Sequence, residues 1–145
     1  MVKFKKNIGS DVMLSGNFYE LLVAFSLVKK DLQVIRADSV AFDLLVVDEK
    51  NKVFKHNNIG ISVKGRESKD NFSMPFKELK IPALNKQCKI WNFEPYYAFV
   101  SLSNICFIPL VEVIKLKKKS KIKSLSLKGA CKNKSAIVFK WETPK

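Results

Sequence analysis

Two short apolar segments, residues 42–47 (FDLLVV) and 59–64 (IGISVK), constrain the fold of this chain more than any other feature. Both are rich in residues that favour strands, and both are too apolar for a solvent-exposed loop, so they predict two buried strands. The residues that follow the first segment, 48–52, are polar and turn-like. The sequence therefore predicts a buried β-hairpin whose connection is centred near Val53.

Each predicted strand carries one charged residue, Asp43 in the first and Lys64 at the end of the second. A charge inside an apolar strand is costly unless it is paired or ligating, although each could also be a strand-end charge that reaches solvent. Side chains alternate along a strand, so Phe42, Leu44 and Val46 are expected to share the face opposite Asp43. The hairpin would bring Asp43 opposite Ser62 and Lys64, and the pleat allows all three on one face, with the register left open.

The rest of the chain alternates between the periodicities of helices and strands. The 145 residues are 47% hydrophobic and contain no internal repeat or linker, which indicates one domain, residues 1–145, with a substantial core. Its lysine-rich segment, 115–134, lacks acidic residues and suits either phosphate contact or a solvated, flexible loop. We expect an α/β fold with helices at 15–30, 74–92 (interrupted at Pro82) and 110–116, and strands at 33–36, 96–102, 105–108 and 136–141.

The chain is strongly basic, with 27 Lys and Arg against 13 Asp and Glu and a net charge of +14. Such a surface neutralises phosphates and releases counterions, so nucleic acid is the natural partner. A lysine-rich composition inherited from the whole proteome, an acidic protein partner and a membrane surface remain alternatives. Only Arg36 and Arg66 are arginines, and lysines act as point charges, so sequence-specific reading of bases is not indicated.

Several functional classes are disfavoured by what the sequence lacks. Cys88, Cys106, Cys131 and the single His56 form no zinc-ligand pattern, and neither zinc nor an organic cofactor is expected. No apolar run approaches the ~20 residues of a membrane helix, and no signal peptide is evident at the N-terminus. We therefore expect a cytoplasmic protein, or a viral protein acting inside a cell, without a membrane partner.

The acids and the lysine around the hairpin suggest one kind of chemistry. Mg²⁺ prefers oxygen ligands and takes one or two carboxylates together with waters and phosphate oxygens. Asp43 and Glu78 could supply the carboxylates, and Lys64 could neutralise charge on a phosphate. Phosphodiester hydrolysis needs these components, so metal-dependent cleavage of nucleic acid is the leading hypothesis.

Residues 16–66 resemble the core of the restriction-endonuclease-like, PD-(D/E)xK nuclease superfamily. Glu20 on a helix, Asp43 on a strand and Lys64 at the end of the next strand follow that family's order. The resemblance implies a mixed central β-sheet flanked by helices. Archaeal Holliday-junction resolvases and Mrr-like restriction nucleases are similar in size and layout.

The chain departs from the usual family pattern at Ser62, where an Asp or Glu normally precedes the lysine by two residues. One branch of type II restriction enzymes has a similar Ser-x-Lys motif and takes the missing acid from the next helix, about fourteen residues after the lysine. Glu78 lies at that distance from Lys64, and Glu67 is a closer but weaker candidate. The resemblance therefore makes Glu78 the migrated acid.

By this resemblance, Asp43 and Glu78 would ligate Mg²⁺ or Mn²⁺, with the Val63 carbonyl as a further ligand. Lys64 would stabilise the attacking hydroxide and the pentavalent phosphate. Glu20 would orient a water or help to bind a second metal. The alternative for Glu20 is a capping box with a residue three positions earlier, Asn17, at the start of the helix.

Other residues are candidates for contact with DNA. Ser62 could donate a hydrogen bond, and Arg66 is the expected phosphate clamp. Cations interleaved with aromatics suit stacking on unpaired bases, although such aromatics more often belong to the core. These residues are Lys86, Lys89, Trp91, Phe93, Tyr96 and Tyr97; the lysine-rich segment adds Lys117, Lys118, Lys119 and Lys121.

Three hypotheses follow. The first is a Mg²⁺-dependent endodeoxyribonuclease, a homodimer by analogy with the family and because cutting two strands often uses two copies. The second is a catalytically inactive nucleic-acid-binding module on the same fold, which the serine at position 62 favours. The third is a basic scaffold that binds an acidic protein.

Overall fold

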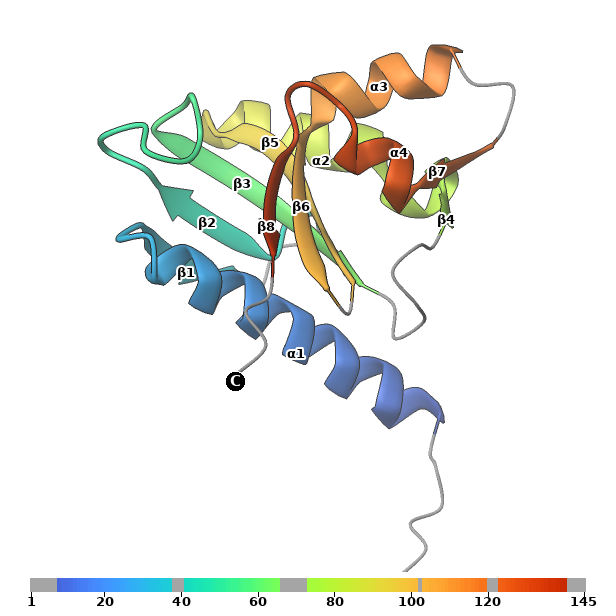
Figure 1. The fold of residues 1–145 in the computed structure, drawn as a ribbon, viewed down its shortest axis with the longest axis horizontal. Coiled ribbons are helices and arrows are strands. Elements are labelled where there is room, and N and C mark those ends of the chain that lie inside the picture. The colour runs from blue at the N-terminus through green and yellow to red at the C-terminus, as the bar shows by residue number, and fades with distance from the viewer. Residues whose placement is uncertain (1–7, 38–40, 66–72, 102, 120–122, 141–145) are drawn as a thin grey trace, which may run out of the picture.

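The computed structural model describes residues 8–37, 41–65, 73–101, 103–119 and 123–140 (Figure 1). A six-stranded sheet forms its centre, with strand order β1-β2-β3-β5-β6-β8, and a separate two-stranded ribbon pairs β4 with β7. The elements are α1 (Ile8–Val28), β1 (Gln33–Arg36), β2 (Leu44–Val47), β3 (Asn58–Gly65), β4 (Ser73–Pro75), the 3₁₀ helix η1 (Phe76–Leu79), α2 (Ile81–Trp91), β5 (Glu94–Val100), β6 (Asn104–Pro109), α3 (Leu110–Lys119), β7 (Ser124–Ser126), α4 (Leu127–Cys131) and β8 (Ile137–Lys140).

The sheet is mixed. β2 and β3 form the predicted antiparallel hairpin, in which Leu44 faces Ile61. β3 and β5 run parallel, and η1 and α2 make the crossover between them. The remaining neighbours in the sheet are antiparallel. The six strands predicted for this sheet are confirmed, with ends that shift by one or two residues.

Helices cover both faces of the sheet. α1 packs on one face, where its Val23 and Leu27 are buried against residues of the central strands such as Ile59 and Ile61. The other face carries η1, α2, α3, α4 and the β4–β7 ribbon. Two hydrophobic clusters therefore lie on opposite sides of the sheet, and the β2–β3 hairpin contributes to both.

Helix α1 begins at Ile8, seven residues before the predicted start. It is apolar around most of its circumference, which predicted burial on most sides. That prediction is only half right, because one side of α1 faces solvent. Its exposed large side chains are Phe18, Leu21, Phe25 and Val28, which are 54–60% exposed.

The predicted helix over 74–92 is wrong at its N-terminal end. Residues 73–75 form strand β4, and a single 3₁₀ turn precedes α2, which begins at Ile81. Lys80 separates the two helices because it adopts the left-handed conformation, with φ of 50°. Pro82 lies in the first turn of α2, where its missing N–H has no intrahelical partner to lose, so it starts the helix instead of interrupting it.

Most of the described part of the lysine-rich segment forms helix and strand, and residues 132–134 at its end form a turn. α3 continues to Lys119, and β7 and α4 follow. Leu125 and Leu127 are buried in the cluster beneath this segment, so apolar residues between the lysines hold it against the sheet. Among the residues that the structure describes, no helix is long and apolar enough to cross a membrane.

Candidate active site

Asp43 lies at the point where strand β2 leaves its regular pairing with β3. Its backbone amide donates to the Ile61 carbonyl at 2.8 Å, although Ile61 already faces Leu44 in the ladder. Its Oδ2 accepts a 2.7 Å hydrogen bond from the Val63 amide. The side chain therefore takes a position in the ladder that a backbone carbonyl would otherwise fill, and the carboxylate is fixed against the end of β3.

The same break corrects the predicted faces of the first strand. Leu44 and Val46 lie in the cluster beneath α1, as one face of a strand should. Phe42 lies in the cluster on the opposite side of the sheet. Because the register breaks at Asp43, alternation does not extend across it, and the prediction that Phe42 shares a face with Leu44 is wrong.

Helix α1 brings Glu20 to Asp43. Partial burial raises the pKa of the Glu20 carboxyl, and the neighbouring Asp43 carboxylate raises it further by charge repulsion and hydrogen bonding. Arg36 on β1 opposes this rise through an ion pair, with 2.9 Å between its Nη2 and Glu20 Oε2. Arg36 also donates to the Asn17 side chain. Two carboxyl groups are therefore held together beside the guanidinium of Arg36.

The capping-box interpretation of Glu20 is wrong. α1 begins at Ile8, so Asn17 and Glu20 lie inside the helix, where backbone amides are already bonded within it. Their side chains instead meet Arg36 from the edge strand β1. The missed residue of this site is thus Arg36, one of only two arginines in the chain, which the sequence indicated only as part of a short strand.

Ser62 and Lys64 share a face of β3, as predicted. Ser62 pairs with Tyr97 and Lys64 with Phe99 on β5, and both aromatic residues belong to the cluster beneath α2 and α3. Ser62 is buried, with 4% of its surface exposed, and Lys64 at the strand end is half-buried. Lys64 follows directly after Val63, the residue whose amide holds Asp43.

Glu78 lies on η1, on the side of the sheet opposite α1. Phe76 and Leu79 anchor η1 in the core, and the Tyr97 hydroxyl donates to the Leu79 carbonyl at 2.8 Å. Glu78 lies between these anchors and is exposed. In the described part of the chain, no three Asp, Glu, His or Cys side chains gather closely enough to hold a metal, so Glu78 does not complete a three-acid cluster with Glu20 and Asp43.

The residues proposed for DNA contact are spread over the surface. Lys86 and Lys89 are exposed on α2, and Trp91 at its end is 57% exposed. Tyr96 and Tyr97 are buried, so the core interpretation of these aromatics is confirmed. Lys117, Lys118 and Lys119 are exposed in the last turn of α3. Arg66, Glu67 and Lys121 lie outside the described residues.

Comparison with known proteins identifies the fold. No protein-family model matches the sequence, and no curated protein matches it. Among solved structures, the chain is similar to the Holliday junction resolvase Hjc of the archaeal hyperthermophile Archaeoglobus fulgidus, with a TM-score of 0.54 and 16% sequence identity over 78% of this chain and 83% of that one. At this identity the likeness concerns the fold alone. The chain has the predicted α/β fold, a restriction-endonuclease-like core with a mixed six-stranded sheet and flanking helices.

Proposed function

We propose that this protein is a metal-dependent endodeoxyribonuclease that acts through a single domain as a homodimer. The observation that carries the proposal is the pair of carboxyl groups, Glu20 and Asp43, beside the end of β3 in a fold similar to that of a junction resolvase. Like charges held together at a sheet end are costly unless a cation or a proton relieves their repulsion. Arg36 already offsets part of this repulsion through its ion pair with Glu20, and a divalent metal would relieve the rest.

The donor set fits Mg²⁺ or Mn²⁺, since it consists of carboxylate and carbonyl oxygens. Asp43 would be the principal ligand, with the Val63 carbonyl as a further one. The second carboxylate is Glu20, which lies against Asp43, or Glu78, which the Ser-x-Lys resemblance favours. The metal would polarise the phosphate and make a bound water more acidic.

The remaining groups would act on the substrate directly. The Lys64 ammonium would neutralise negative charge that develops on the phosphate in the transition state. In other enzymes, removal of one such donor lowers the catalytic rate by about 100-fold or more. Glu20, where it is not a ligand, orients the attacking water. Ser62 can donate a hydrogen bond but carries no charge, so it cannot replace the carboxylate that the family usually has there.

DNA is the proposed substrate because of the net charge of +14 and the exposed lysines on α2 and α3. Lys86, Lys89, Lys117, Lys118 and Lys119 would contact phosphates, together with Arg66 and Lys121. Lysines do not read base edges in the forked geometry that arginine offers, so recognition by DNA shape is favoured over recognition of a sequence. Two copies would cut the two strands of a duplex or junction.

The test is cleavage of labelled duplex, single-stranded and four-way-junction DNA with Mg²⁺ or Mn²⁺. Asp43→Asn and Lys64→Ala should each reduce cleavage by about 100-fold or more, and Glu49→Gln, an exposed acid in the hairpin loop, should have no effect. Loss of activity in Glu20→Gln but not in Glu78→Gln would identify the second carboxylate as Glu20, and the reverse result would identify Glu78. Cleavage that survives in Asp43→Asn would refute the proposed site.

The second candidate is an inactive nucleic-acid-binding module. Ser62, at the position where the family usually has a carboxylate ligand, favours it. This candidate requires salt-sensitive binding of DNA by wild type and by every variant, with no metal-dependent cleavage of any substrate. A protein that neither cuts nor binds DNA would leave the third hypothesis, a scaffold for an acidic protein.

A further inference from the structure

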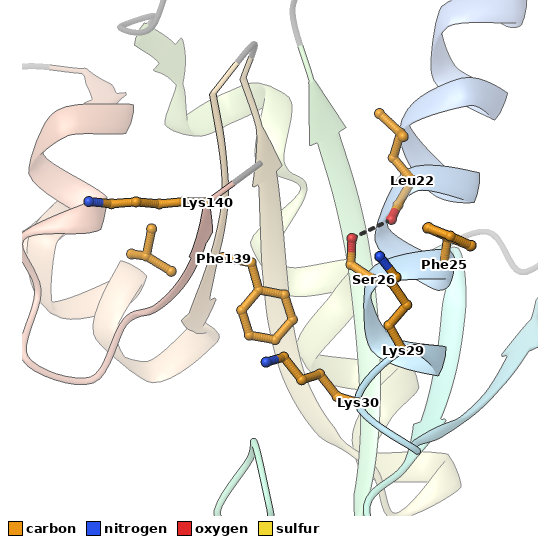
Figure 2. A pocket seen from close by; sticks show the side chains of 8 residues that line it. Leu22, Phe25, Ser26, Lys29, Lys30, Phe139 and Lys140 are labelled. Atoms are coloured by element: carbon orange, nitrogen blue, oxygen red, sulfur yellow. Dashed lines mark hydrogen bonds between the residues drawn. The ribbon is translucent and has the colours of Figure 1, made fainter. Parts of the chain in front are cut away.

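A groove of about 670 Å³ lies between the C-terminal half of α1 and the edge strand β8 (Figure 2). Its volume is within the range of small-ligand sites. All its charged lining residues are lysines, so among the described lining residues nothing would repel an anion. The lining consists of Leu22, Phe25, Ser26, Lys29, Lys30, Val138, Phe139 and Lys140.

Two of these lysines are placed by aromatic rings. The Lys29 Nζ lies 5.2 Å from the centroid of the Phe25 ring, and the Lys30 Nζ lies 5.6 Å from that of Phe139. Such cation–π contacts hold an ammonium group near an apolar surface while its N–H donors stay available. Figure 2 shows Lys29 and Lys30 on the helix side of the groove and Phe139 on the strand side. The groove therefore offers positive charge next to aromatic surface.

The neutral polar group in the groove is already used. The Ser26 hydroxyl donates to the Leu22 carbonyl at 2.8 Å within α1. Recognition in the groove thus rests on the ammonium groups and on the Phe25 ring, which is 60% exposed. Cations beside exposed aromatic rings are the features by which proteins hold unpaired nucleic acid, with phosphates on the cations and bases stacked on the rings.

The groove is separate from the carboxylate pair. With 3.6 residues per turn, Leu22 and Ser26 project from the flank of α1 opposite Glu20, and Lys29 directly follows the helix. Glu20 meets β1 through Arg36, whereas the groove residues face β8 at the other edge of the sheet. Nucleic acid in the groove would therefore be a second contact of the substrate, away from the site of cleavage.

We propose that the groove between α1 and β8 binds an unpaired strand of nucleic acid, with phosphates on Lys29 and Lys30 and one base on Phe25. A duplex keeps its base faces inside, so it could use the lysines but not the ring. The proposal rests on the proposed function for its choice of nucleic acid as the ligand, and it adds a preference for substrates with an unpaired segment.

The experiment is fluorescence anisotropy with a labelled oligothymidylate and a labelled duplex of equal length, in EDTA, over a series of KCl concentrations. Lys29→Gln/Lys30→Gln should weaken oligothymidylate binding about fivefold or more and reduce the magnitude of the log–log salt slope by about 1.4, the value for two lost phosphate contacts on a single strand. The matched control is Lys50→Gln/Lys55→Gln, which removes the same charge from exposed positions in the β2–β3 connection. It should change affinity less than about twofold.

The stacking contact has its own control. Phe25→Ala should weaken oligothymidylate binding about fivefold or more while duplex affinity stays unchanged. Phe18→Ala removes the same side chain, similarly exposed, from a position on α1 outside the groove, and it should change neither.

Several results would overturn the proposal. One is an equal loss of oligothymidylate affinity in the Lys29/Lys30 variant and in the Lys50/Lys55 control. Another is an equal loss of duplex and single-strand affinity in Phe25→Ala. A third is binding of an acidic peptide, but not of oligothymidylate, that is weakened by the Lys29/Lys30 substitutions. Conversion of a dimer to a monomer by Phe25→Ala or the Lys29/Lys30 variant, measured by light scattering, would assign the groove to a second copy. Because binding is measured in EDTA, without metal, the test of the groove is independent of whether the protein cleaves DNA.

Discussion

Asp48 is expected to determine the stability of the β2–β3 hairpin without taking part in chemistry. It follows β2, is only 2% exposed, and accepts three backbone hydrogen bonds of 2.8 Å. The donors are the amides of Lys52, Val53 and Phe54 in the connection to β3. One carboxylate therefore accepts hydrogen bonds from three successive backbone amides that lie outside the strands.

The cost of removing this carboxylate can be estimated bond by bond. The Phe54 amide is buried, so losing its charged partner costs roughly 1.5–3 kcal/mol. The Lys52 and Val53 amides are partly buried and can regain water, so each costs about 0.5–1.5 kcal/mol. Asp48→Ala should therefore lower the free energy of unfolding by about 2.5–6 kcal/mol, or the melting temperature by roughly 8–20 °C for a chain of this length. Asp48→Asn keeps one acceptor oxygen and should cost about half as much.

The assay is urea unfolding followed by circular dichroism, together with thermal melts. The neighbouring Glu49→Gln is the control, because Glu49 is exposed and its substitution should change stability by less than about 0.5 kcal/mol. Any nuclease activity of Asp48→Ala, measured well below its melting temperature, should remain near that of wild type. A loss of stability under about 1 kcal/mol would refute the reasoning that these three bonds organise the hairpin.

Two further predictions concern the packing of α1 and the cysteines. A Cβ at Gly65 would overlap the Tyr19 ring of α1, so Gly65→Ala should lower the free energy of unfolding, measured in urea, by about 1–3 kcal/mol. Gly16 has open space around it, so Gly16→Ala should raise the free energy of unfolding by about 0.5–1 kcal/mol. Equal effects of the two substitutions would contradict this packing. A hydrogen bond from Cys106 lowers the pKa of the Cys131 thiol to about 7, so its alkylation by iodoacetamide, followed by mass spectrometry, should rise through about pH 7 and shift to higher pH in Cys106→Ala. Burial raises the pKa of Cys88 to about 11, and labelling of Cys88 as fast as Cys131 at pH 7 would contradict that assignment.

Much of the fold could be predicted from local patterns. The hairpin of β2 and β3 has alternating or continuous apolar residues bounded by polar ones, and each of the two strands buries a full face. The errors arise where local patterns compete. The residues before α2 have helix-like spacing, but Lys80 in the left-handed conformation and the pairing of β4 with β7 override it. A three-residue ribbon between segments about fifty residues apart leaves no periodic signal to detect.

The candidate site was only partly predictable for a similar reason. The order of Glu20, Asp43 and Lys64 along the chain indicated a site, but spacing along the sequence does not determine which acids meet in space. Glu20 meets Asp43 because α1 crosses the sheet beside β1, and its ion pair with Arg36 depends on that tertiary packing. The spacing of Glu78 from Lys64 matches the family variant, and η1 holds Glu78 exposed on the side of the sheet that Ser62 and Lys64 face.

The two aspartates that flank β2 have different roles in the structure. The sequence placed Asp43 inside an apolar strand, where a charge suggests function, and Asp48 in a polar turn, yet both carboxylates accept hydrogen bonds from backbone amides. A carboxylate has about four acceptor positions. Asp48 commits three of them to backbone amides, which leaves little capacity for a ligand. Asp43 accepts a hydrogen bond from the Val63 amide through Oδ2 and stands against a second carboxyl, that of Glu20. The Arg36 ion pair with Glu20 offsets part of the repulsion between the two carboxyl groups, and a bound divalent cation would offset the rest. Asp43→Asn should therefore leave the free energy of unfolding nearly unchanged while abolishing metal-dependent activity. Asp48→Asn should lower the free energy of unfolding while leaving any such activity near that of wild type.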